Sequence, residues 1–250
     1  MLEKSSSSGT KSSSVHVVCD FDGTVALEDV TDGLLERFAD ARWKQIETQW
    51  LSGEIGSREC MSRQVGLIKA PRRELDRYLD EVEIDPLFAS FVDECDRLSH
   101  IKLEVSSDGI DYAVRRILDN HGLSRVGVRA NALIAVSDTT YRLGFPHYLA
   151  SCRAQAGNCK CAAARRFSEC SPSYSATVLI GDGMSDFCVA STVDFVFAKN
   201  RLLAHCIAAG IRHQAFDGFA DVQRGFARAL EELTDRSESG RPLKETSSDT

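Results

Sequence analysis

Two acidic residues, one position apart, directly follow an apolar run near the start of the chain. The run, residues 15–19, reads VHVVC, and Asp20 and Asp22 come next in the segment DFDGT. A run rich in β-branched residues predicts a buried β-strand. A carboxylate at a strand end can act as a nucleophile, and a second one can transfer protons as a general acid and base. We therefore take this pair as the candidate reaction centre.

Three further polar residues follow later apolar runs or open a helical pattern. Ser107 comes after 101–106, Asp182 comes after 177–180, and Lys160 precedes an alanine-rich helical start. Ligands of open α/β sheets bind at the carboxyl ends of the strands, so we expect these side chains to meet the first acidic pair at one edge. Acids gathered there repel one another unless a cation neutralises them, and hard oxygen ligands suit Mg²⁺.

The remaining sequence predicts the elements that position these residues. Short apolar runs at 15–19, 101–106, 177–180 and 194–198 are bounded by turn signals and separated by helical patterns. This alternation predicts an α/β fold with a Rossmann-like parallel sheet that is covered on both faces. In residues 131–145, apolar and polar residues alternate on both sides of the central SDTT, which predicts a hairpin. The C-terminal segment predicts a helix with one apolar face, formed by Phe219, Val222, Phe226, Leu230 and Leu233.

The longest helical pattern lies between the first two predicted strands. It covers 31–98, whereas an ordinary crossover between parallel strands needs only about a dozen residues. An inserted helical cap after the first strand explains the excess. Both ends of the chain are polar and predicted to be disordered. The predicted order is therefore tail, α/β core, cap, α/β core and tail, at 1–14, 15–28, 29–98, 99–234 and 235–250.

The overall composition argues against a nucleic-acid partner and against a membrane protein. The 250 residues carry a formal net charge of −7, so overall charge gives no support for nucleic-acid binding. No apolar run approaches the roughly 20 residues that a membrane helix needs. The Ser-rich N-terminus lacks the apolar core of a signal peptide. We expect a cytoplasmic protein that is a monomer or a homodimer.

The cysteines do not have the spacing of a zinc site. The chain has nine, and the one cluster comprises Cys152, Cys159, Cys161 and Cys170, with six, one and eight intervening residues. Structural zinc sites usually show a pair separated by two to four residues. Reduced thiols in the cytoplasm and no bound zinc are the expectation.

The order and spacing of the motifs resemble the haloacid dehalogenase-type phosphatase superfamily. The matching pieces are DFDGT at 20–24, SSDG at 106–109, Lys160, and GDGMSD at 181–186. A helical insertion directly after the first motif is similar to the cap type of phosphoserine phosphatases. The runs RQVGLI and SDGIDYAV, and the PH…SC…GNCK stretch, are similar to phosphatases of methionine salvage. The resemblance implies a phosphatase for a small phosphorylated metabolite.

The same resemblance implies a role for each central residue. Asp20 would attack phosphorus and form an aspartyl-phosphate, and Asp22 would protonate the leaving oxygen and then deprotonate water. Ser107 would hold a phosphate oxygen, and Lys160 would supply a fixed positive charge. Backbone N–H groups beside these residues, those of Gly23, Asp108 and Gly109, would also contact the phosphate.

The metal ligands and the contacts to the rest of the substrate are likewise implied by the resemblance. Mg²⁺ would be bound by Asp182, one oxygen of Asp20 and the main-chain carbonyl of Asp22. Asp186 is a second acidic position, as a ligand or as a residue that orients a metal-bound water.

The substrate beyond the phosphate is expected to meet cap residues. Asp29 aligns with a glutamate by which phosphoserine phosphatases recognise the substrate amine. Arg58 and Arg63 are candidates for an anionic or carbonyl-bearing substrate, and His147 for a contact from the long loop. Solvated helix arginines and an ordinary loop histidine fit the same pattern.

Several functions stay open at this point. The leading hypothesis is a Mg²⁺-dependent phosphatase, with a methionine-salvage ketose phosphate or phosphoserine as its substrate. A binding or regulatory protein that has lost turnover is a hypothesis of another class, although such a protein would not need the general acid. A phosphotransferase that passes the phosphoryl group to an alcohol is the third.

Overall fold

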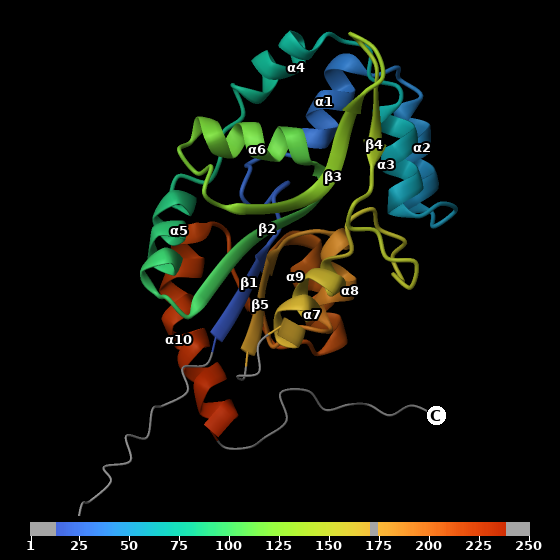
Figure 1. Ribbon diagram of the computed structural model, residues 1–250. Helices are drawn as coiled ribbons and strands as arrows, with labels where there is room; N and C mark the ends of the chain where they lie inside the picture. Colours follow the sequence, from blue (N-terminus) through green and yellow to red (C-terminus); the bar gives the residue numbers. More distant parts are fainter. Residues whose placement is uncertain (1–13, 171–174, 239–250) are drawn as a thin grey trace, which may run out of the picture.

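Seven strands form one sheet in the part of the chain that the computed structural model describes, residues 14–170 and 175–238. The order is β4-β3-β2-β1-β5-β6-β7, and every neighbouring pair is parallel except the antiparallel β3–β4 hairpin. Figure 1 labels strands β1 to β5 of this sheet. The bounds are β1 (Ser14–Cys19), β2 (Ile101–Ile110), β3 (Gly127–Ala135), β4 (Tyr141–Gly144), β5 (Ser175–Gly181), β6 (Phe195–Ala198) and β7 (His213–Ala215). The predicted α/β fold with a mostly parallel sheet is therefore confirmed.

The predicted strands and hairpin are present, with two differences. β2 runs on to Ile110 through an irregular register after Ser106, so SSDG is a bulged continuation of the strand beyond its predicted end at residue 106. β7 was not predicted, because its three residues include no apolar run and none of them is buried. The central position of β1 puts Asp20 between the ends of β2 and β5.

Helices cover both faces of the sheet. One side carries α5 (Phe88–Arg97), α6 (Asp111–Asn120) and α10 (Phe219–Glu238), and the other carries α7 (Lys160–Cys170), α8 (Phe187–Ala190) and α9 (Asn200–Ala209). The residues of β1 alternate between the two sides, because successive side chains of a strand point to opposite faces. Val17 and Cys19 belong to one buried cluster and Val18 to the other.

Four helices from the insertion between β1 and β2 lie at the end of the sheet where β1 stops (Figure 1). They are α1 (Val30–Phe38), α2 (Trp43–Leu51), α3 (Ser57–Val65) and α4 (Arg72–Leu79). The fifth inserted helix, α5, packs instead on α10, where the Phe88 and Phe219 rings are 4.9 Å apart and the Phe91 and Phe226 rings are 5.0 Å apart. We therefore propose that the cap ends before α5, earlier than the predicted boundary at residue 98.

The ends of the described chain differ slightly from the predicted tails. Ser14 is the first residue of β1, and α10 continues to Glu238, beyond the predicted tail start at residue 235. The rest of both predicted tails, 1–13 and 239–250, lies outside the described residues. Among the helices that are described, none combines the length and the apolar character needed to cross a membrane.

Candidate active site

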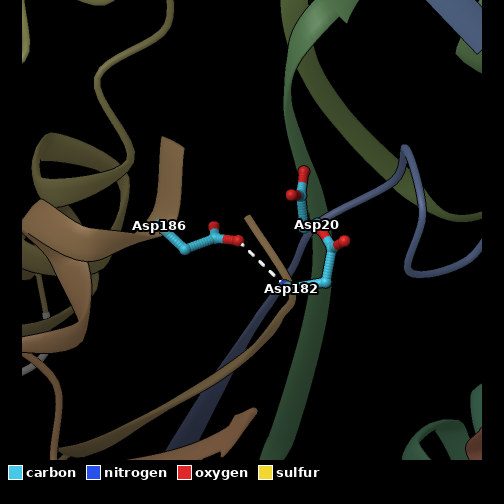
Figure 2. Close-up of side chains that lie close together, drawn as sticks. All are labelled: Asp20, Asp182 and Asp186. Atoms are coloured by element: carbon cyan, nitrogen blue, oxygen red, sulfur yellow. Dashed lines mark hydrogen bonds between the residues drawn. The ribbon is translucent and has the colours of Figure 1, made fainter. Parts of the chain in front are cut away.

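Three carboxylates meet at the carboxyl ends of β1 and β5. Asp20 follows β1, Asp182 follows β5, and Asp186 ends the short 3₁₀ helix η1 (Met184–Asp186). One oxygen from each lies within 4.8 Å of the others. Figure 2 shows the three side chains close together. Asp20 and Asp186 are buried, and Asp182 is partly exposed. The structure thus brings together three of the acids that the sequence singled out.

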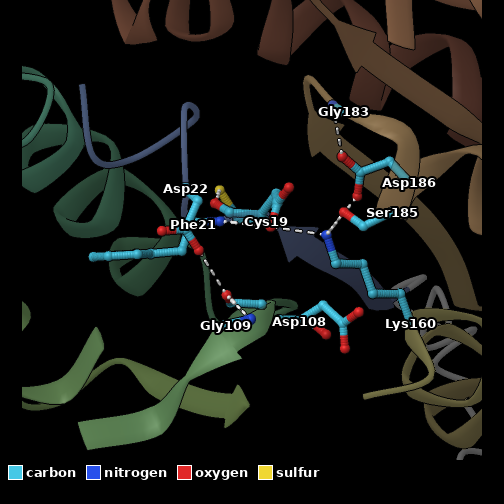
Figure 3. Close-up of polar contacts among 12 residues, drawn as sticks. Cys19, Phe21, Asp22, Asp108, Gly109, Lys160, Gly183, Ser185 and Asp186 are labelled. Atoms are coloured by element: carbon cyan, nitrogen blue, oxygen red, sulfur yellow. Dashed lines mark hydrogen bonds and ion pairs between the residues drawn. The ribbon is translucent and has the colours of Figure 1, made fainter. Parts of the chain in front are cut away.

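Lys160, the first residue of α7, places its ammonium group among these acids (Figure 3). Its Nζ lies 2.8 Å from Asp20 Oδ1 and 2.7 Å from Asp186 Oδ1, and it donates to Ser185 Oγ at 3.1 Å. Burial alone would lower the pKa of Lys160, but the two carboxylates outweigh it and raise the pKa above its usual value. Lys160 therefore stays protonated and provides a fixed positive charge.

Asp186 has both carboxylate oxygens engaged by donors. Oδ1 pairs with Lys160, and Oδ2 accepts from the backbone N–H groups of Asp182 at 3.2 Å and Gly183 at 3.3 Å. These bonds fix both the lysine and the loop that carries Asp182. This geometry fits an orienting role for Asp186 better than a role as a direct metal ligand, because both of its oxygens already accept hydrogen bonds or pair with Lys160.

The donor set fits a divalent cation. Burial and the nearby Asp186 charge raise the pKa of Asp20, against the lowering effect of Lys160. Burial also raises the pKa of Asp182. Three carboxylates facing one ammonium leave an excess of negative charge, and a hard cation bound by oxygens would offset it. Asp20 and Asp182 have the oxygens for this.

Asp22 lies on the other side of Asp20, among hydrogen-bond donors. Its Oδ1 accepts from the Val30 N–H at 2.9 Å, and its Oδ2 accepts from the Ser107 hydroxyl at 3.1 Å. Burial and the charge of Asp29 raise the pKa of Asp22 to about 7, although the two hydrogen bonds act in the opposite direction. A carboxyl group with this pKa can both give and take a proton near neutral pH.

Two glycines let these groups approach closely. Gly23 has φ +66°, and a Cβ there would lie 2.8 Å from Asp182 Oδ2. A Cβ on Gly109 would lie 2.8 Å from Asp22 Oδ2. The Gly109 N–H donates to Ser107 Oγ at 2.8 Å, so in this structure it positions Ser107.

Asp108 connects the cap with the end of β2. Its partly buried carboxylate accepts from the Ser57 hydroxyl at the start of α3, from the Asn158 N–H at 3.0 Å and from the Asn131 amide. The sequence predicts contact of the Asp108 backbone with phosphate but indicates no role for the side chain. Ser57 could not be recognised beforehand, because a serine at a helix start usually serves the helix itself.

Asn158 is a second residue that the sequence did not indicate. Its side-chain amide donates to Ser106 Oγ at 3.1 Å, to the Ser107 carbonyl at 2.9 Å and to the Arg129 carbonyl at 3.0 Å. It stands two positions before Lys160. One side chain therefore ties the serine segment of β2 to the start of α7.

A cavity of about 480 Å³ opens from the carboxylates toward the cap. Asp29 lines it, as do Asp20, Asp22, Gly23, Asp108, Gly109 and Asp182. Arg58, Arg63 and His147 are absent from its lining. The Arg58 guanidinium lies 4.0 Å from the centre of the Tyr148 ring, and Arg63 pairs with Glu59 at 3.4 Å.

The cysteine cluster lies around the start of α7. Cys152, Cys159, Cys161 and Cys188 are free thiols, and burial raises the pKa of Cys159 and of Cys161. The side chain of Cys170 lies outside the described part of the structure. The absence of zinc from this cluster stays a prediction.

Known proteins of similar sequence include two phosphatases of the same name. No family model matches the chain. It is 32% identical over 215 residues to the 2-hydroxy-3-keto-5-methylthiopentenyl-1-phosphate phosphatase of an Exiguobacterium species, covering 84% of this chain and 95% of that protein. The protein of the same name from Bacillus pumilus is 28% identical over 231 residues, covering 90% and 97%.

Solved structures share the fold. A substrate-bound phosphoserine phosphatase superposes with a TM-score of 0.65 at 17% identity, covering 86% of this chain and 98% of that one. A phospho-aspartyl intermediate analogue of phosphoserine phosphatase gives a TM-score of 0.64 at 17% identity, covering 85% and 98%. The sequence relatives and the carboxylate site agree. The chain therefore belongs to the haloacid dehalogenase-type phosphatases, in the family of the 2-hydroxy-3-keto-5-methylthiopentenyl-1-phosphate phosphatases, and it is a phosphoric monoester hydrolase.

Proposed function

We propose that the protein is a Mg²⁺-dependent phosphatase that hydrolyses a small phosphorylated metabolite through an aspartyl-phosphate on Asp20. The observation that carries the proposal is the position of Asp20, buried between the Lys160 ammonium and the Asp182 carboxylate at one end of a 480 Å³ cavity. A cation bound by Asp20, Asp182 and the Asp22 carbonyl would offset the repulsion between nucleophile and phosphate.

The residues divide the reaction into two steps. In the first, a carboxylate oxygen of Asp20 forms a bond to phosphorus while the bond from phosphorus to the ester oxygen breaks. The Asp22 proton passes to that leaving oxygen. In the second, Asp22, now ionised, takes a proton from water, and the water oxygen displaces Asp20 as inorganic phosphate forms. Lys160 and Ser107 hold the phosphoryl oxygens through both steps.

The named relatives support a methionine-salvage ketose phosphate as the substrate. Both relatives carry the name of a phosphatase for 2-hydroxy-3-keto-5-methylthiopentenyl-1-phosphate. Phosphoserine is a second candidate, because Asp29 lines the cavity at the position that the resemblance relates to amine recognition.

A cytoplasmic setting and a small-molecule partner complete the proposal. All eight cysteines whose side chains the structure describes are free thiols, which suits a reducing compartment. A nucleic-acid partner is not expected from the charge of −7. A monomeric or homodimeric state stays a prediction.

The test is phosphate release from both candidate substrates, measured with Mg²⁺ and with EDTA. We expect release with Mg²⁺, strong loss with EDTA, and no release by Asp20→Asn. Full activity in EDTA would contradict the metal assignment. Binding without release of phosphate from any ester would favour the regulatory protein. Phosphorylation of added alcohols would identify a phosphotransferase.

A further inference from the structure

The cap wall of the active-site cavity is acidic. We infer that Asp29, Asp32 and Glu47 exclude a second anionic group from the substrate, so that the substrate's alcohol part is neutral or cationic. This inference rests on the proposed function, because the catalytic residues at the base of the cavity define where the phosphate lies. Asp29, Asp32 and Glu47 determine only which charge the rest of the substrate can carry.

The three acids come from two helices and line one cavity. Asp29 is the N-cap of α1, and its Oδ1 accepts the Asp32 N–H at 2.9 Å. Glu47 lies on α2, and its Oε2 accepts the Gln64 amide at 2.8 Å. The phosphate-side residues Asp20 and Asp22 line the same cavity, so a substrate held there extends toward this wall.

The charges on this wall are not balanced by cations. Asp29 and Asp32 are exposed to the cavity and the solvent, yet partial desolvation by the cavity walls, together with repulsion from neighbouring acids, raises the pKa of each to about 6, so both are mostly ionised above neutral pH. Among the described residues that line the cavity, Arg201 is the only lysine or arginine. Its guanidinium lies 3.4 Å from the Met184 sulfur, beside the core loop rather than on the cap wall.

Arg58 and Arg63, the candidates for an anionic or carbonyl-bearing substrate, do not neutralise the negative charge of the cap wall. Arg58 stacks on Tyr148, and Arg63 pairs with Glu59, outside the cavity lining. A carboxylate on the substrate would therefore approach three like charges without a compensating cation. Phosphoserine carries such a carboxylate.

The rest of the cap wall accepts an uncharged group. Apolar and weakly polar side chains from α2, α3 and the segment before α1 line it: Leu27, Trp50, Leu51, Cys60 and Met61. These side chains can cover an apolar end of an alcohol, and the acids can accept hydrogen bonds from hydroxyl or ammonium groups. The selected class is thus a phosphate monoester whose alcohol part carries no negative charge.

The experiment compares ester pairs that differ in one carboxylate. One pair is phosphoethanolamine and phosphoserine, and the other is glycerol 1-phosphate and 3-phosphoglycerate. We expect kcat/KM with Mg²⁺ to be at least about tenfold higher for the member without the carboxylate in each pair. Asp32→Asn and Glu47→Gln should each lower the ratio of the two kcat/KM values in both pairs. Glu81→Gln, an exposed acid of the insertion outside the cavity lining, should leave them unchanged.

The outcomes separate the inference from the proposed function. Equal kcat/KM within both pairs, or a preference for the carboxylate member, would overturn the inference while leaving a working phosphatase. Ratios that stay the same in both cavity variants would overturn the role of the acids. No hydrolysis of these esters or of p-nitrophenyl phosphate would contradict the proposed function, and the inference with it.

Discussion

Asp22 is held where its carboxyl group carries a proton near neutral pH. Burial raises its pKa to about 7, and Val30 and Ser107 orient it toward the site. Asp22→Asn removes the proton donor but keeps the size of the side chain. We therefore expect a large loss with alkyl phosphates, whose leaving oxygen needs protonation, and a smaller loss with p-nitrophenyl phosphate.

Single-turnover kinetics check this prediction, because they report the phosphorylation step apart from dephosphorylation. The wild-type phosphorylation rate with alkyl phosphates should also fall as pH rises through about 7, where the acid form of Asp22 is lost. An equal loss for both substrate types in Asp22→Asn would show that Asp22 is not the general acid.

Gly23 is a second residue with a sharp steric requirement. Gly23→Ala would place a Cβ 2.8 Å from Asp182 Oδ2 and would keep a backbone at φ +66°. We expect at least about a tenfold rise in the Mg²⁺ concentration needed for half-maximal activity, since a displaced carboxylate is a poorer ligand. Gly53→Ala is the matched control, with φ +78° and no atom within 4 Å of the added Cβ. A similar change in both variants would mean that only backbone strain matters.

At the scale of elements, Asn158 connects β2, β3 and α7. Its amide donates to Ser106, Ser107 and the Arg129 carbonyl. Asn158→Asp keeps the shape and removes the donors, which costs about 1–3 kcal/mol of stability and loosens the phosphate site. We expect the inhibition constant for inorganic phosphate to rise about tenfold.

The control for Asn158→Asp is Asn120→Asp, on the exposed end of α6, where the amide donates to Asp80. Equilibrium unfolding separates stability from phosphate binding in both variants. If Asn158→Asp lowers stability but binds phosphate as the wild type does, Asn158 is a structural residue without a positioning role.

The elements show what the sequence can and cannot predict. Local apolar runs predicted β1, β5 and β6, and the rule for parallel strands then placed Asp20 and Asp182 at one edge. The packing of α5 on α10 was not predictable, because an amphipathic helix has the same pattern in a cap as in a core. Asn158 was missed because its three partners lie far away in the sequence.

The side chains of the cap show the same limit of sequence patterns. Nothing in the sequence singles out Asp32 and Glu47, and only the packing of α1 and α2 places them on one cavity. Arg58 and Arg63 fitted both a contact to an anionic or carbonyl-bearing substrate and a solvated helix surface, and in the structure they contact Tyr148 and Glu59 outside the cavity lining. A charged residue in a helical pattern is a good predictor of an exposed side chain, but it does not predict whether that side chain faces a cavity.

At the scale of the whole molecule, metal binding should stabilise the fold. A ligand at 100 times its Kd stabilises the folded state by about 2.7 kcal/mol, which corresponds to a rise in Tm of about 5–10 °C for a chain of this size. Thermal unfolding with and without Mg²⁺ measures this rise. Asp182→Asn should abolish most of it, whereas Asp138→Asn, an exposed acid in the β3–β4 turn, should not. A rise of equal size in Asp182→Asn would place the metal elsewhere.

The central claim is that the phosphoryl group passes through Asp20. The most direct measurement is rapid acid quench of the enzyme with substrate and Mg²⁺, followed by mass spectrometry of its peptides. We expect a phosphoryl group on the peptide that contains Asp20, and none in Asp20→Asn. A phosphoryl group trapped on another residue, or turnover by Asp20→Asn at the wild-type rate, would contradict it.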